Sequence, residues 1–553
     1  MTIVQRRIGG IFGLFFLLLV VAGARTLYLG ALKGGSLRKA AATQQLTYEA
    51  VPAQRGSISD RNGIDLAVSE PAQDISATPY LVKEPLATAQ KLAPLLGKPQ
   101  AKVLRELSER SGFVYLARAL PAKQAHAVMA LRIPGVAGAP VMRRVYPRGT
   151  LAAQVLGVVG TEGNGLSGLE YSRNALLHGQ TGQRHVVSDA IGQPVSINEP
   201  HPEQAGTPVS LTLDANIQQR TEDVLSAVGR VFSPKDATAI VMDPRSGAIL
   251  AMANWPQVNA NDPAASSPEA LQNRAVGFDY EPGSTFKAFT VAGALQQGLV
   301  NPASSFYIPD KIKVADRTIH DDTEHGDETL TTAQILAQSS NVGAIKIGML
   351  EGKSSFSSWI SRFGFGKRTG VELPGEEIGQ VLPVSHYSGS SMGNLPIGQG
   401  QLVTPLQMAS AYSAIANGGI LRSPHIIRSV GSEPQPLPVG HRVISSATAA
   451  SLRQMLEGVL APGGTASEVS IPGYKLAGKT GTAQKVDLAT GEYSKSRYVA
   501  SFMGFAPASN PKLLAAVIVD EPQAGSIFGG TVAAPAFGQI MSFALPYLRI
   551  PPG

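Results

Sequence analysis

The pattern of apolar and polar positions opens with one long apolar stretch. Residues Ile8 to Ala24 are uncharged and almost wholly apolar, and after Arg25 the chain is apolar again as far as Leu32. A helix from Ile8 to Leu29 would be about 33 Å long, which is enough to cross a membrane. A cleaved signal peptide is the alternative, since Ala22-Gly23-Ala24 has the small residues of a cleavage site. The apolar stretch continues past that point, so we expect an uncleaved anchor within residues 1–33.

The next part of the chain predicts helices and a linker. Residues 34 to about 50 form a polar connector, and residues 81–132 carry Leu and Ala at helical spacing, with breaks at Gly97 and Pro121. The stretch 198–206 is polar and contains two prolines, which indicates a linker. We therefore expect one domain over residues 34–205 and a second over residues 206–553.

The second expected domain contains both apolar runs of strand length and apolar residues at helical spacing. Apolar runs of strand length predict strands at 208–213, 237–242, 248–253, 498–505 and 512–519, with a hairpin turn at 243–247. Helical spacing predicts helices at 216–228 and 539–548 and a mostly helical region from 284 to about 465. Helices and strands within one unit indicate an α+β multidomain protein whose second domain contains an antiparallel sheet.

The amino-acid composition excludes several kinds of partner and site. The 553 residues are 43% hydrophobic and 16% charged, and the net charge of +7 comes from 47 Lys and Arg against 40 Asp and Glu. No run of Lys and Arg stands out, so we expect no nucleic-acid partner. The chain has no cysteine, which excludes disulfides, thiolate metal sites and a cysteine nucleophile.

The first chemical motif is Ser284-Thr285-Phe286-Lys287. Ser-x-x-Lys occurs three times, at Ser36, Ser284 and Ser509, but only Ser284 follows a Pro-Gly break and opens a helical run. Residues three apart on a helix are neighbours, about 5–6 Å between Cβ atoms, so Lys287 can reach the hydroxyl of Ser284. By itself the motif is better explained by a helix-capping serine beside a solvated lysine.

Two further motifs follow in the same expected domain. Ser339-Ser340-Asn341 comes after a helical stretch at 331–338, and Lys479-Thr480-Gly481-Thr482 lies beside Gly478. Each could be an ordinary turn. Together, and in this order, the three motifs supply a nucleophile, a base, a proton relay and an anion clamp, which acyl transfer through serine requires.

With these motifs the chain resembles the class B penicillin-binding proteins, the monofunctional D,D-transpeptidases. The resemblance extends to further segments, Arg55–Gly63, Tyr146–Gly149, Gly168–Glu170, Met242–Gly247 and Gly398–Gly400. It implies a membrane anchor, an elongated non-catalytic pedestal and a penicillin-binding transpeptidase domain with an antiparallel sheet flanked by helices.

The resemblance also implies roles for the motif residues. Ser284 would attack a peptidoglycan stem peptide, Lys287 would be its base, and Lys479 the cation that lowers the pKa of Lys287. Ser339 would relay a proton, and Asn341 would position Lys287 and the substrate amide. The remaining members, Thr480, Gly481 and Thr482, would form the carboxylate-binding and oxyanion part of the site. No cofactor and no metal are implied, and β-lactams would inhibit the enzyme.

The same resemblance places the catalytic domain outside the cytoplasmic membrane, where its substrate lies. A role in septal cell division is favoured by the chain length, short insertions and the end at Gly553, with elongation and sporulation as alternatives. A glycan polymerase of the shape, elongation, division and sporulation family and other division-complex membrane proteins would be the partners. A β-lactamase or a non-catalytic β-lactam sensor fits less well, since the Glu376-Glu377 segment lacks the deacylation motif of class A β-lactamases.

Two other groups of charged residues are interpreted as structural. His320 to Glu328 is rich in His, Asp and Glu, but Asp327 and Glu328 also suit the N-terminus of a helix, so we expect no metal. Arg55, Asp60 and Glu170 are interpreted as a structural ion-pair network that joins domains.

Overall fold

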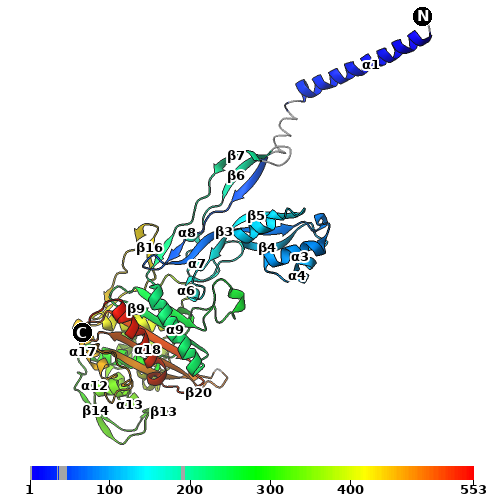
Figure 1. The fold of residues 1–553 in the computed structure, drawn as a ribbon. Coiled ribbons are helices and arrows are strands. Elements are labelled where there is room, and N and C mark those ends of the chain that lie inside the picture. The colour runs from blue at the N-terminus through cyan, green and yellow to red at the C-terminus, as the bar shows by residue number, and fades with distance from the viewer. Residues whose placement is uncertain (1–2, 34, 36–45, 189–193, 488, 553) are drawn as a thin grey trace. The chain divides into compact units, whose positions relative to one another are not determined.

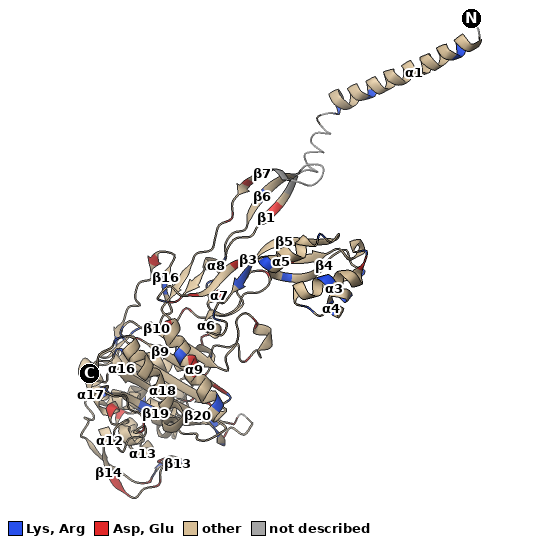
Figure 2. Ribbon diagram, viewed as in Figure 1, with Lys and Arg blue, Asp and Glu red and all other residues tan. Residues whose placement is uncertain are grey.

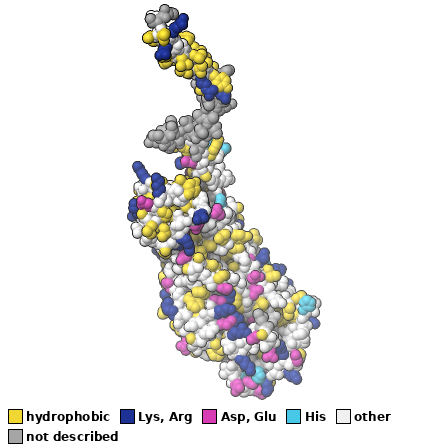
Figure 3. Space-filling view, turned by 90° about the vertical axis from the view of Figure 1, so that its right-hand side faces the viewer, with side chains coloured by type: hydrophobic (Ala, Val, Ile, Leu, Met, Phe, Trp, Pro, Cys, Tyr) yellow, Lys and Arg dark blue, Asp and Glu magenta, His cyan; other side chains and the backbone are white. Residues whose placement is uncertain are grey.

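The computed structural model describes residues 3–33, 35, 46–188, 194–487 and 489–552. Helix α1 (Ile3–Leu27) continues into a π-helical turn, η1 (Tyr28–Leu32), and its side chains are exposed. Within the described residues one helix, Ile3–Ala31, is long and apolar enough to cross a membrane, with a mean hydropathy of 2.1. Hydrophobic side chains cover this helix (Figure 3), and Lys and Arg are confined to its ends (Figure 2). Most of the expected polar connector lies outside the described residues.

The chain forms two compact units, and neither is one continuous run of sequence. The first comprises residues 1–54, 71–142 and 179–206, and the second comprises 55–70, 143–178 and 207–553. Segments 55–70 and 143–178 therefore belong to the second unit, although both precede the expected linker. The domain limits drawn from the sequence remain predictions.

The first unit contains a three-stranded antiparallel sheet of β1 (Leu46–Val51), β6 (Gly182–Ser188) and β7 (Pro194–His201). It also contains a small hydrophobic core centred on Leu92, Val103 and Leu116. Three helices and parts of three strands form this core: α3 (Pro85–Leu96), α4 (Gln100–Leu107), α5 (Ala122–Ala130), β4 (Val114–Pro121), β5 (Val136–Val145) and the last part of β3 (Asp65–Ala77).

Two expectations for this unit are wrong. The helical region 81–132 contains strand β4, which pairs with β3 and buries Leu116 and Leu120. Leucine suits both element types, and here pairing with a neighbouring strand decides the structure. Part of the expected linker, Asn198 to His201, also lies in a strand, because its backbone pairs with β6.

The second unit is built on a five-stranded antiparallel sheet (Figure 1). Its strand order is β10 (Ile249–Trp255), β9 (Asp236–Met242), β21 (Leu513–Asp520), β20 (Tyr493–Ala506) and β19 (Ala477–Val486). Alternate residues of β9 and β21 enter two different cores, because successive side chains of a strand point to opposite faces. Helices α9 (Ala215–Phe232) and α18 (Gly529–Tyr547) cover one face, and α16 (Pro405–Ala416) packs on the other.

The α+β architecture and the expected central strands are confirmed. The closing helix α18 begins at Gly529, ten residues earlier than expected, and continues through Pro535. The region from 284 to 465 contains short strands that were not expected, β11 (Ser305–Ile308) with β14 (Glu328–Thr331) and β12 (Lys311–Val314) with β13 (Arg317–His320). Glu328 therefore starts a strand, and the following helix is capped by Thr331 instead.

The expected ion-pair network lies within the second unit and has different members. The Glu170 carboxylate is fully buried and accepts from Arg55 Nε at 2.5 Å and Arg144 Nε at 2.6 Å. Asp60 is also buried, but it accepts from the backbone N–H groups of Asn62, Ile64 and Ala215. Asp60 thus stabilises a turn and is not part of the ion-pair network.

Candidate active site

Ser284 lies on a single 3-10 turn, η4 (Gly283–Phe286), directly before helix α11 (Lys287–Gln296). The Thr285 hydroxyl donates to the carbonyl of Pro282 at 2.7 Å, and the Tyr412 hydroxyl donates to the carbonyl of Thr285 at 2.6 Å. Ser284 itself is 8% exposed. The turn is therefore fixed from both sides while the serine keeps a small opening to solvent.

Lys287 begins α11 and has no exposed surface. Its Nζ donates to Asn341 Oδ1 at 2.7 Å, to Ser339 Oγ at 3.2 Å and to the carbonyl oxygen of Ser339. Burial lowers the pKa of Lys287 to about 8, against the opposing effect of Asp322 and Asp321. Among the described residues these contacts, and not one to the Ser284 hydroxyl, are its hydrogen bonds, so the motif Ser339–Asn341 holds the amine.

Ser339, Ser340 and Asn341 form the junction between two helices. Helix α12 (Thr332–Gln338) ends at Ser339, whose φ of 65° is left-handed, and Ser340 caps α13 (Asn341–Glu351) by accepting from the N–H of Gly343 at 2.9 Å. The side chains of Ser339 and Asn341 then both face Lys287. A helix ending with an immediate restart thus brings two polar groups to one amine.

Lys479 lies on β19, which is the edge strand of the five-stranded sheet. Its side chain is fully buried, and Nζ donates to the carbonyl of Thr480 at 3.2 Å. Burial, and then the charge of Lys287, lower the pKa of Lys479 well below its ordinary value. The Thr480 hydroxyl pairs with Thr465 at 2.6 Å, and the Thr482 hydroxyl accepts from the N–H of Gly529 at 3.1 Å.

Glycines allow the serine turn to approach its neighbours closely. A Cβ on Gly481 would lie 2.9 Å from Thr285 Cγ2 and 3.1 Å from the carbonyl oxygen of Pro282. A Cβ on Gly398 would collide with the carbonyl oxygen of Gly283 and lie 2.8 Å from its nitrogen. Strand β19 and the segment at 398 therefore both contact the backbone that carries Ser284.

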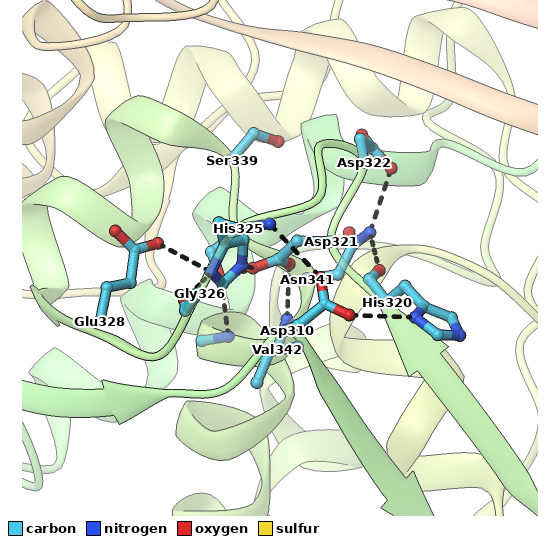
Figure 4. A network of polar contacts seen from close by, with 12 residues as sticks. Asp310, His320, Asp321, Asp322, His325, Gly326, Glu328, Ser339, Asn341 and Val342 are labelled. Carbon is cyan, nitrogen blue, oxygen red and sulfur yellow. Dashed lines mark hydrogen bonds and ion pairs between the residues drawn. The ribbon is translucent and has the colours of Figure 1, made fainter.

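The acidic cluster after β13 lies beside this site (Figure 4). Asp321 accepts from the N–H of Val342 at 2.9 Å, and Asp322 accepts from Asn341 Nδ2 at 3.2 Å. Within the part of the chain that the structure describes, no group of three or more His, Cys, Asp or Glu could hold a metal ion. Sequence reasoning noted these two carboxylates but missed their contacts, since no local spacing connects residue 322 with residue 341.

The structure therefore brings the three motifs together around one small region. It contains a slightly exposed serine hydroxyl, two buried amines whose neutral forms are favoured by burial, and a β-strand edge with backbone donors and acceptors. An amine whose pKa lies near physiological pH is neutral in part of the molecules, and in that form it can accept a proton from a hydroxyl. The set is suited to acyl transfer through a serine.

Comparisons with known proteins agree with this chemistry. The family model described as penicillin binding protein transpeptidase domain matches residues 237–542, and the penicillin-binding protein dimerisation domain matches residues 50–211. Penicillin-binding protein PbpB of Mycobacterium tuberculosis is 35% identical over 97% of this chain and 84% of its own length. Peptidoglycan D,D-transpeptidase FtsI of Escherichia coli is 33% identical over 98% of this chain and 91% of its own length.

Two further comparisons bear on role and fold. Stage V sporulation protein D of Bacillus subtilis is 34% identical over 94% of this chain and 81% of its own length. The crystal structure of penicillin-binding protein 3 of Mycobacterium tuberculosis, in complex with aztreonam, superposes with a TM-score of 0.73 at 31% identity, over 91% of this chain and 98% of that one. With its motifs, its fold and these relatives, the chain belongs to the class B penicillin-binding proteins, the family of serine-type peptidoglycan D,D-transpeptidases.

Proposed function

We propose that Ser284 is the nucleophile of a D,D-transpeptidase that crosslinks peptidoglycan stem peptides. The observation that carries the proposal is the arrangement at Lys287, a fully buried amine that begins the helix next to Ser284 and contacts both Ser339 and Asn341. A buried amine with a pKa of about 8 is neutral in about a tenth of the molecules at pH 7, far more than an ordinary lysine. It can therefore serve as the base that activates the serine.

In the first half-reaction Ser284 Oγ attacks the carbonyl carbon between the last two D-alanines of the donor stem. Lys287 takes the hydroxyl proton, the C–N bond breaks, and the terminal D-alanine leaves as an amine after receiving a proton through Ser339. In the second half-reaction an amine of a neighbouring stem attacks the ester and releases Ser284. Backbone N–H groups of Ser284 and Thr482 would bind the oxyanion, and each such donor is worth about 3 kcal/mol.

Lys479 is assigned to the terminal carboxylate of the donor. Its charge is buried, and its neighbours in space are Lys287 and Thr480. A bound carboxylate would stabilise the ammonium form of Lys479, and that positive charge would in turn favour neutral Lys287. Substrate binding would thus help to prepare the base, and β-lactams would enter the same site and acylate Ser284.

Acylation by a labelled penicillin tests whether Ser284 is the nucleophile. We expect Ser284→Ala to abolish labelling of the full-length protein, since the ester cannot form, while the unfolding temperature stays close to that of the wild type. Ser36→Ala and Ser509→Ala alter the two other Ser-x-x-Lys sequences and should label normally. Normal labelling of Ser284→Ala would refute the assignment.

The proposed place of action is the outer side of the cytoplasmic membrane, with α1 as the anchor and the septum as the site of synthesis. The relatives named FtsI and PbpB favour a division role, and the similar identity of a sporulation protein keeps that role as the alternative. A glycan polymerase of the shape, elongation, division and sporulation family is the proposed partner. Fluorescent imaging of the tagged protein distinguishes these roles: enrichment at midcell supports septal synthesis, and dispersed wall patches contradict it.

A further inference from the structure

Two adjacent carboxylates on the loop after β13 contact the Ser339–Asn341 junction in different ways. Asp321 Oδ1 accepts from the N–H of Val342 at 2.9 Å, and its Oδ2 accepts from the Ser340 hydroxyl at 2.7 Å. These bonds satisfy donors in the first turn of α13, so Asp321 stabilises the start of that helix. Asp322 contacts the side chain of Asn341 instead.

The amide of Asn341 connects Asp322 with Lys287. Its Nδ2 donates to Asp322 Oδ1 at 3.2 Å and to the carbonyl of His320 at 2.9 Å, while its Oδ1 accepts from Lys287 Nζ at 2.7 Å. The two donor bonds fix which end of the amide faces the lysine. A carboxylate at one end of such a chain polarises the amide and stabilises positive charge at the other end.

The charged groups that face Lys287 come from two parts of the chain. Lys479 approaches from β19, and Asp321 and Asp322 approach from the loop after β13. Asp321 is partly neutralised, because His325 Nε2 lies 3.1 Å from its Oδ2, and the hydrogen bonds of His325 to the Gly326 carbonyl and then to Asp321 raise the pKa of His325. Asp322 makes no ion pair with a described residue, has the larger effect of the two on Lys287, and also acts on Lys479.

We propose that Asp322 is a positioning residue for transpeptidation: it orients the Asn341 amide, and its negative charge favours the protonated form of Lys287. The inference rests on the proposed role of Lys287 as the base. It assigns a function to a residue outside the three motifs. Asp322 would then determine how far the pH must rise before Lys287 can accept the proton of Ser284.

The test is the pH dependence of acylation in the full-length protein, measured with a fluorescent penicillin. For the wild type we expect the acylation rate to rise with a midpoint near pH 8, where the buried Lys287 loses its proton. Asp322→Asn keeps an oxygen for Asn341 Nδ2 but removes the charge, so the midpoint should move down by about half a unit to one unit. At pH 6.5 the neutral fraction of Lys287 would rise about three- to eightfold.

Two further variants separate charge from structure. Glu324→Gln removes the same charge from the same exposed loop, at a residue without a contact to the site, and should leave the midpoint in place. Asp322→Glu retains the charge and should restore a midpoint close to that of the wild type. Thermal unfolding of all three variants shows whether a change in rate reflects loss of the fold.

The outcomes are distinguishable. If the Asp322→Asn midpoint stays at the wild-type value, or if Glu324→Gln shifts it equally, the inference is overturned while the base role of Lys287 stands. A wild-type profile with no rise between pH 7 and 9 would instead overturn the base role of Lys287, and the inference with it. A variant that unfolds early but keeps the wild-type midpoint also contradicts the inference, because a purely structural contact then explains the residue.

Discussion

At the scale of single residues, the proposed chemistry depends on two lysines without exposed surface, Lys287 and Lys479. Water would stabilise their charged forms, and its exclusion lowers the pKa of both. Because each lysine also disfavours charge on the other, the pair titrates as a unit, and a ligand that binds one alters the other. The oxygen atoms around Lys287 hold it in position in either protonation state.

A prediction at this scale concerns the glycine that contacts the serine turn. Gly398→Ala should abolish or strongly reduce penicillin acylation and destabilise the fold by about 1–3 kcal/mol, because the new Cβ collides with the backbone of Gly283. Gly400→Ala is the matched control. Its φ of 75° is as strained as the 79° of Gly398, but its Cβ would have no neighbour closer than 3.9 Å.

Acylation rate and unfolding midpoint measured side by side check this prediction. Equal losses in the two variants would mean that left-handed backbone strain, and not the close approach, explains the effect. A larger loss in Gly398→Ala supports the steric explanation.

The sequence was sufficient to predict Ser284, Ser339 and Lys479 as site residues, because each lies in a short motif whose order and flanking residues are visible locally. It was not sufficient for Asp321 and Asp322. Their partners lie about twenty residues away on another element, and only the hairpin β12–β13 brings them together. A cluster rich in His and Asp suggested a metal or a helix start, while its contacts serve the junction of α12 and α13.

At the scale of elements, the central sheet explains why its strands were predictable. β9 and β21 are buried on both faces, so their sequences are continuous apolar runs of strand length. β4 was missed because it is half-buried, and its leucines fit helical spacing equally well. The two short strand pairs in the 305–331 region were missed because their strands have only four residues each.

A second prediction concerns the buried ion-pair network. Glu170→Gln should lower the free energy of unfolding by about 3–5 kcal/mol, because two arginines lose the charge that compensates theirs in a buried site. The exposed pair of Arg184 and Glu49 is the control, and Glu49→Gln should cost less than about 1 kcal/mol.

Denaturant unfolding of the full chain, followed by two probes, measures both variants. An effect of Glu170→Gln no larger than that of Glu49→Gln would show that solvent or local rearrangement compensates the arginines.

At the scale of the whole molecule, the one long apolar helix among the described residues is consistent with the proposed single crossing of the membrane. The charges near α1 do not decide its orientation, since Arg6 and Arg7 precede the apolar stretch and Arg25 and Lys33 follow it. The proposed orientation rests on the substrate, which lies outside the membrane.

The absence of cysteine makes this orientation testable. Ser354→Cys introduces a single thiol at an exposed position of the second unit, on helix α14 (Lys353–Arg362). We expect a membrane-impermeant maleimide to label this thiol in intact spheroplasts. Thr2→Cys, before α1, is the matched control and should be labelled only after the membrane is opened. The reverse pattern would contradict the proposed orientation.

The close approach of backbones around Gly283, Gly398 and Gly481 has a consequence for antibiotic resistance. A substitution that excludes a β-lactam by adding bulk at these glycines would also displace the serine turn that crosslinking needs. With Ser284 as the proposed nucleophile, bulk at these three glycines would therefore reduce crosslinking together with β-lactam binding. Substitutions that reduce acylation by β-lactams but keep crosslinking would have to occur at other side chains around the site. An inhibitor that contacts the backbone at Gly283, Gly398 and Gly481 would therefore be difficult to evade by substitution of these glycines.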